Sequence, residues 1–191
     1  MLSLIEIINH YDTVLSPFNY IIKSQNNLTL EFDIKPSEVC HLLFGTINKG
    51  LPMRQNYKGL NGYNKIKDET VTWDNLPHSV KKHSNIRTEY FDKFHKLLDK
   101  PSSGIFYNSK IVQNIHALKL KTTDIQGDFL IYKVIDNCIL HLILENVSTN
   151  GTYRLTPKCF FVRKLANSNA DVFLQNQKEF PILSSTKVLK P

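Results

Sequence analysis

The chain has 191 residues, of which 41% are hydrophobic and 10% aromatic, so we expect a folded domain with a sizeable core rather than disorder. Lys and Arg outnumber Asp and Glu by 24 to 17, and the net charge of +7 favours a polyanionic partner. Three scattered cysteines exclude a disulfide scaffold and show no zinc spacing, which fits a reducing, cytoplasmic location. Apolar runs are too short to span a bilayer and no basic leader is seen, so neither membrane insertion nor secretion is expected.

The first part of the chain predicts helix, strand and helix in turn. Residues 2–23 carry a helical apolar stripe that Ser16 and Pro17 should interrupt, which predicts an N-terminal helical segment within residues 1–27. Residues 28–34 alternate between apolar and polar side chains, which is typical of a half-buried strand. A short helix should follow from residue 36 and end at Gly45.

The most polarised part of the chain begins after this helix. Residues 45–85 contain four glycines, two prolines and little periodicity, which predicts a long loop. Its first part holds five basic residues and no acidic one, interleaved with two tyrosines: Lys49, Arg54, Tyr57, Lys58, Tyr63, Lys65 and Lys67. Such a loop can clamp an RNA backbone while its rings stack on bases. A solvated loop without a partner is an equally good interpretation.

The second half predicts two helices followed by antiparallel strands. Residues 86–98 and 109–120 carry helical apolar faces. Strands over 129–135 and 138–147 should form a tight hairpin, because the two residues between them, Asp136 and Asn137, suit positive φ angles.

A second turn, at Asn150 and Gly151, should lead into a strand over 152–162. Pro157 inside that strand calls for an edge, a bend or a bulge, and residues 180–183 could add a fourth short strand. The expected fold is α+β, with N-terminal helices followed by an antiparallel β-sheet meander. We expect one domain over 1–191, with a core at 28–164 and a C-terminal extension at 165–191.

Motifs for metal or nucleotide chemistry are absent from the sequence. It contains no glycine-rich phosphate loop, no HExxH or EF-hand pattern and no carboxylate cluster spaced for magnesium, so no cofactor is expected. The remaining His, Lys, Arg, Tyr and hydroxyl groups suit metal-independent RNA cleavage. In that reaction the 2′-hydroxyl attacks its own phosphate, and the protein supplies a base, an acid and cations.

Two segments are the strongest candidates for this chemistry. His41 lies in an apolar helix directly before the basic loop, although a histidine in such a context is more often a core residue. Arg154, Thr156 and Lys158 share one face of an extended segment until Pro157 perturbs the alternation, and they could bind a phosphate, although basic residues also protect edge strands from aggregation. His141, in the expected central strand, could face either the core or a cleft.

The segment Cys40-His41-Leu42-Leu43-Phe44-Gly45 resembles the "HLLG"-type helix of phage-associated nucleases in the barnase/EndoU/colicin/RelE (BECR) superfamily. The segment Thr156-Pro157-Lys158-Cys159-Phe160-Phe161 is similar to the "YP-x-S-f" strand signature of that family. The resemblance, over roughly residues 28–164, implies that His41 is the catalytic histidine and that Pro157 and Cys159 occupy the Pro and Ser positions. Cys159 and the inserted Phe44 depart from the family pattern.

The leading hypothesis is a metal-independent endoribonuclease acting on RNA, tRNA included. His41 would serve as general acid or base, Arg154 and Lys158 as cations, and Thr156 or Cys159 as an assisting group. The resemblance implies a toxin or anti-phage effector restrained by an antitoxin or immunity protein. The alternatives are a catalytically inactive RNA- or DNA-binding module and a prophage interaction protein.

Overall fold

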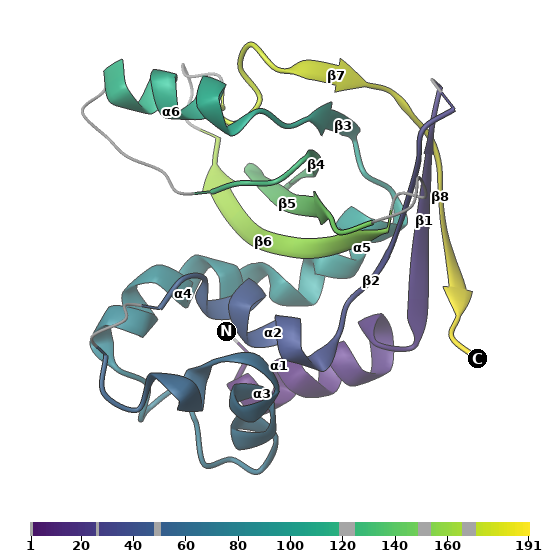
Figure 1. Cartoon of the computed structure of the whole chain (residues 1–191). Helices are drawn as coiled ribbons and strands as arrows, with labels where there is room; N and C mark the ends of the chain where they lie inside the picture. Colours follow the sequence, from purple (N-terminus) through teal and green to yellow (C-terminus); the bar gives the residue numbers. More distant parts are fainter. Residues whose placement is uncertain (1, 26, 48–50, 119–124, 149–153, 166–170) are drawn as a thin grey trace.

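The computed structural model describes residues 2–25, 27–47, 51–118, 125–148, 154–165 and 171–191. It has an α+β architecture in which helices from the first hundred residues pack beneath a five-stranded antiparallel sheet (Figure 1). A three-stranded sheet lies to one side, where the first and last strands of the chain meet (Figure 1). The expected fold class is therefore confirmed at the level of helices followed by antiparallel strands.

The N-terminal segment is only half helical. Helix α1, Leu4–His10, begins at a Ser3–Glu6 capping box and continues as a π-helical turn, η1, over Tyr11–Leu15. The chain then forms strand β1, Phe18–Ser24, so the expected helical segment over 1–27 is wrong from residue 18 onward. Pro17 cannot continue the helix, and the following residues bury alternate side chains between two neighbouring strands.

Strand β2, Thr29–Asp33, and helix α2, Pro36–Phe44, occur where the sequence predicts them. Pro36 occupies the first turn of α2, where its missing N–H costs no hydrogen bond. Gly45 ends the helix with a φ of 68°, and its N–H donates to the carbonyl of His41. The apolar side of α2 lies in the main core.

Residues 45–85 are not a long loop. The described part contains a 3-10 turn, η2, at Arg54–Tyr57 and helix α3, Gly59–Lys67, and it ends inside helix α4, His78–Tyr90. Gly62 lies within α3 because the helix packs closely on α2: a Cβ there would be 2.9 Å from the Sγ of Cys40. The glycines that indicate a loop in the sequence therefore serve in part as close-contact positions between helices.

The expected helix over 86–98 is a composite of three helical pieces. Helix α4 ends at Tyr90, a 3-10 turn, η3, covers Phe91–Lys93, and α5 covers Phe94–Asp99. Strand β3, Ser103–Phe106, follows in a stretch that the sequence indicates only as a helix terminator. Helix α6, Ser109–Leu118, agrees with the prediction as far as the structure describes that region.

The predicted meander forms three adjacent strands of the larger, five-stranded sheet. Its strands are β4, Phe129–Ile135, β5, Cys138–Asn146, and β6, Leu155–Lys164, and the whole sheet has the order β6-β5-β4-β3-β7. Asp136 and Asn137 have φ angles of 50° and 59°, which confirms the predicted tight hairpin. The turn predicted at Asn150 and Gly151 lies outside the described residues.

The C-terminal extension completes both sheets. The single strand expected at 180–183 is instead two strands on either side of Pro181, β7, Lys178–Phe180, and β8, Ile182–Leu189. Strand β7 pairs with β3, whereas β8 pairs with β1 to give the order β2-β1-β8. The first and last strands that the structure describes thus share one sheet.

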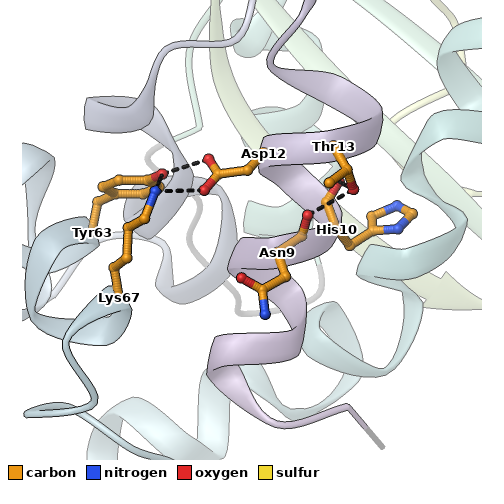
Figure 2. A network of polar contacts seen from close by, with 6 residues as sticks. All are labelled: Asn9, His10, Asp12, Thr13, Tyr63 and Lys67. Atoms are coloured by element: carbon orange, nitrogen blue, oxygen red, sulfur yellow. Dashed lines mark hydrogen bonds and ion pairs between the residues drawn. The ribbon is translucent and has the colours of Figure 1, made fainter.

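A polar contact joins the N-terminal helical stretch to α3. One carboxylate oxygen of Asp12, in η1, accepts a hydrogen bond from the hydroxyl of Tyr63 (Figure 2). The other oxygen forms an ion pair with the Nζ of Lys67, at a distance of 2.8 Å. Tyr63 is only 5% exposed, and its ring packs edge-on against that of Tyr11. The hydroxyl of Tyr63 therefore has Asp12 as its acceptor, while it accepts a longer hydrogen bond of 3.4 Å from Lys67.

Replacing Asp12 is expected to weaken this junction more than replacing Lys67. Asp12→Ala leaves the largely buried Tyr63 hydroxyl without its acceptor, which should lower the free energy of unfolding by about 1–2 kcal/mol. Lys67→Met removes an exposed ammonium and its long hydrogen bond to Tyr63, leaves the Tyr63–Asp12 hydrogen bond in place, and should cost much less. Urea denaturation followed by circular dichroism measures both variants, and equal losses would contradict this interpretation of the junction.

Candidate anion-binding site

A cavity of about 400 Å³ lies where the end of α2, helix α4 and strands β5 and β6 come together. Apart from Phe44 and Ile125, its lining comes from positions far apart in the sequence: His41, Gly45, Thr46, Arg87, Gln126, Glu145, Lys158 and Cys159. His41, from the early helix, and Lys158, from the late strand, therefore lie in one cavity, as the sequence analysis expects of an imidazole and a cation. The sequence analysis missed Arg87 and Glu145.

His41 lies on the edge of α2 that faces β6. The ring is half-buried, and burial, together with the positive charges of Arg87, Lys158 and Lys58, lowers the pKa of the imidazole below its ordinary value. A hydrogen bond between the ring and the main chain of Lys158 opposes this shift without cancelling it. His41 is therefore a neutral imidazole at pH 7, able to accept a proton.

Lys158 lines the cavity at a bulge in strand β6. Ile143 pairs with Cys159 while the next residue, Leu144, pairs with Pro157, so Lys158 is the extra residue on β6. This irregularity beside Pro157 confirms the prediction made from the proline. The Nζ of Lys158 lies 2.7 Å from the Oε2 of Glu145, on the neighbouring strand β5.

Arg87 enters the cavity from α4 and lies directly against Gly45. Gly45 has a φ of 68°, which residues with a side chain rarely adopt, and a Cβ there would be 2.6 Å from Nη1 of Arg87, so the guanidinium would have to move. Nη1 is buried and has no hydrogen-bond partner among the described residues. A buried guanidinium nitrogen without an acceptor is a favourable position for an anion.

Cys159 is buried beside this guanidinium. Burial raises the pKa of its thiol, and the charge of Arg87 and a hydrogen bond with it offset only part of that increase. The thiol is therefore protonated at neutral pH and is not an activated nucleophile. Its position fits the support of Arg87 better than a covalent role.

Two of the five predicted catalytic residues do not line the cavity. The hydroxyl of Thr156 donates instead to Glu38 at 3.3 Å. Arg154 is exposed at the beginning of β6, where its main chain forms an isolated bridge with Glu31 of β2. Arg154, Thr156 and Lys158 still alternate with buried neighbours along this segment, but of the three only Lys158 lines the cavity.

The predicted RNA-binding residues fall into three groups. Lys49 lies outside the described residues. Arg54, Tyr57 and Lys58 are partly exposed in and after η2, and Lys58 is near enough to act on the pKa of His41. On α3, Lys65 is half-exposed, whereas the buried Tyr63 and its neighbour Lys67 are held by Asp12, so Tyr63 offers no free face for stacking a base.

His141 belongs to the core rather than to the cavity. Its side chain is fully buried, its ring stacks on Phe161, and its Nε2 lies 3.1 Å from the Oδ2 of Asp171. Arg163 approaches the same carboxylate at 3.7 Å. The interpretation of His141 as a core residue is confirmed.

The described residues contain no group of three or more His, Cys, Asp or Glu side chains arranged to hold a metal ion. Nor does any helix among them have the length and apolar character that crossing a bilayer requires. Comparison of the chain with protein-family models, curated proteins and solved structures found no match. The resemblance to BECR nucleases therefore stays a prediction.

The contact between Gly45 and Arg87 can be tested by substitution. Gly45→Ala combines backbone strain with a clash at the guanidinium and should lower the free energy of unfolding by about 2 kcal/mol or more. Gly59→Ala is the matched control, because Gly59 also has a positive φ, 54°, but has open space where a Cβ would lie. Thermal or urea unfolding measures both variants, and a loss at Gly45 no larger than that at Gly59 would contradict the proposed close contact.

Proposed function

We propose that this cavity binds an RNA phosphodiester and that the protein is a metal-independent endoribonuclease. The observation that carries the proposal is the convergence of a neutral imidazole, His41, with two cations, Arg87 and Lys158, in one cavity. These are the groups that cleavage by an RNA 2′-hydroxyl requires, because the nucleophile belongs to the substrate. RNA is the proposed partner, and the net positive charge of the chain, with 24 basic and 17 acidic residues, supports association with it.

In this mechanism His41 is the general base. It takes the proton of the 2′-hydroxyl while the 2′-oxygen attacks phosphorus and the bond from phosphorus to the 5′-oxygen breaks. The ammonium of Lys158 donates a proton to the departing oxygen, and the products are a 2′,3′-cyclic phosphate and a 5′-hydroxyl. Both protein groups then return to their starting states by proton exchange with water.

Arg87 and Glu145 support this reaction in different ways. The unpartnered Nη1 of Arg87 is available to a non-bridging oxygen, where negative charge increases in the transition state. An ammonium has three N–H donors, and Glu145 occupies one donor of Lys158 while holding the side chain at the cavity. The remaining donors of Lys158 can serve the phosphate and the departing oxygen.

The central test is cleavage of total RNA and of tRNA in EDTA, followed by end-group analysis. We expect 2′,3′-cyclic phosphate ends, and we expect His41→Ala to lower the rate by about 10² to 10⁴, the usual contribution of one proton-transfer group. His78→Ala, which alters an exposed histidine at the beginning of α4, is the matched control and should cut at the parent rate. Undiminished cleavage by His41→Ala would exclude His41 as the base.

The pH dependence follows from the direction of the pKa shift. A base must be deprotonated, and the pKa of His41 is lowered, so kcat/KM should rise with pH, reach half its maximum below about pH 6.5 and be level at neutrality. Lys58→Met removes a positive charge that lowers this pKa and should move the midpoint to higher pH. A rate that falls between pH 5.5 and 7.5 would instead assign His41 the role of acid.

One observation favours a second candidate, an RNA- or DNA-binding module without catalysis. Cys159 stands where the resemblance to BECR nucleases implies a serine, and burial keeps its thiol protonated. Such a module would bind RNA with an affinity that falls steeply with salt and would leave the RNA intact in the EDTA assay. The toxin or anti-phage role and the inhibitory partner are further proposals that rest on the resemblance alone.

A further inference from the structure

The charges that line the cavity do not all have the same sign, and their balance indicates which kind of phosphate fits. Among the described lining residues, Arg87 and Lys158 are positive, Glu145 is negative, and His41 is neutral at pH 7. The lining therefore carries one net positive charge. A phosphodiester inside an RNA strand carries one negative charge, whereas a terminal phosphate has a second ionisation near pH 6 and carries close to two at pH 7.5.

We propose that Glu145 makes the cavity selective for phosphodiesters within a strand and against terminal phosphates and free nucleotides. This inference rests on the proposed function of the cavity, and it adds the class of phosphate that is admitted. The selecting element is the carboxylate of Glu145, 2.7 Å from the ammonium of Lys158. It neutralises one of the two cations before any ligand arrives.

A second negative charge in the ligand would meet no unpaired cation in the lining, because Glu145 already pairs with Lys158. It would lie near Glu145 in a partly enclosed site, where repulsion between like charges is stronger than in water. It would also have to leave its hydration shell without a compensating partner. A diester avoids both penalties, because its single charge is matched by Arg87 and by the donors that Lys158 retains.

Substitution of Glu145 should reverse this preference. In Glu145→Gln the amide carries no charge, and Lys158 becomes fully available, so the lining has two net positive charges. The cavity of this variant matches a phosphate dianion. A role for Glu145 in merely holding β5 and β6 together would instead change the affinity for both kinds of phosphate alike.

The test compares two ligands that differ by one methyl group and one charge. The diester is 2′-O-methyladenosine 3′-methylphosphate, the monoester is 2′-O-methyladenosine 3′-phosphate, and neither can be cleaved because the 2′-oxygen is blocked. Binding is measured by NMR titration of backbone amides at pH 7.5 and low salt, with Gly45 as the reporter at the cavity.

We expect the parent protein to bind the diester roughly tenfold more tightly than the monoester, and we expect Glu145→Gln to bind the monoester at least as tightly as the diester. Glu89→Gln removes an equal charge from an exposed position on α4 outside the cavity lining and should keep the parent preference. Thermal unfolding of each variant shows that it is folded.

Three results would overturn the proposal: equal or tighter binding of the monoester by the parent protein, an unchanged preference in Glu145→Gln, and no shift of the cavity amides with either ligand. Because the ligands cannot react, this experiment is separate from the cleavage assay. A diester preference in a protein that does not cut RNA would leave the selectivity standing and overturn the endoribonuclease. Cleavage of RNA by a protein without that preference would leave the endoribonuclease standing and overturn the selectivity.

Discussion

The site depends on one packing arrangement, in which a polar edge of helix α2 lies along strand β6. Glu38, His41 and Gly45 follow one another along this edge. Glu38 accepts from the hydroxyl of Thr156, the ring of His41 bonds to the main chain of Lys158, and Gly45 leaves room for Arg87. Two positions on α2 and its C-cap residue thus meet three different partners. A small displacement of α2 would disturb the proton-accepting group and the anion-binding group together.

The energetics of the cavity also favour a ligand. A buried guanidinium nitrogen without an acceptor is costly, because it has lost water and gained no partner. The neighbouring groups do not remove that cost: the thiol of Cys159 is protonated, and the carboxylate of Glu145 is paired with Lys158. The cost falls when an oxyanion binds between the cations. An arrangement of this kind is more easily explained by ligand binding than by the stability of the empty fold.

Local sequence signals predicted the parts of the structure that local chemistry decides. Helix α2 follows from Pro36 and Gly45 at its two ends, and the β4–β5 hairpin follows from two residues that tolerate positive φ. The bulge on β6 follows from a proline in a strand that must otherwise pair along its length. In each of these places a few adjacent residues determine the backbone geometry.

The errors arose where distant segments decide the outcome. The sequence of strand β1 also fits a helix, because its apolar residues suit either period, and one of its two pairing partners, β8, lies more than 150 residues away. Gly62 indicates a loop in the sequence, because its close contact with Cys40 on α2 exists only in the folded structure. Arg87 and Glu145 carry no motif, since each becomes a site residue only when α4 and β5 meet β6.

The same tertiary contacts divide the positive charge of the chain between two uses. The basic run predicted as one RNA-binding loop folds onto α2, and Asp12 binds Lys67 at the far end of α3. Lys58, at the start of the same helix, acts on His41. The first half of this basic run therefore acts on the site through Lys58, whereas the second half stabilises the fold through Lys67. RNA contact by this segment is accordingly proposed for Arg54, Tyr57 and Lys58, which lie before α3, and not for the face of the helix that Asp12 already holds.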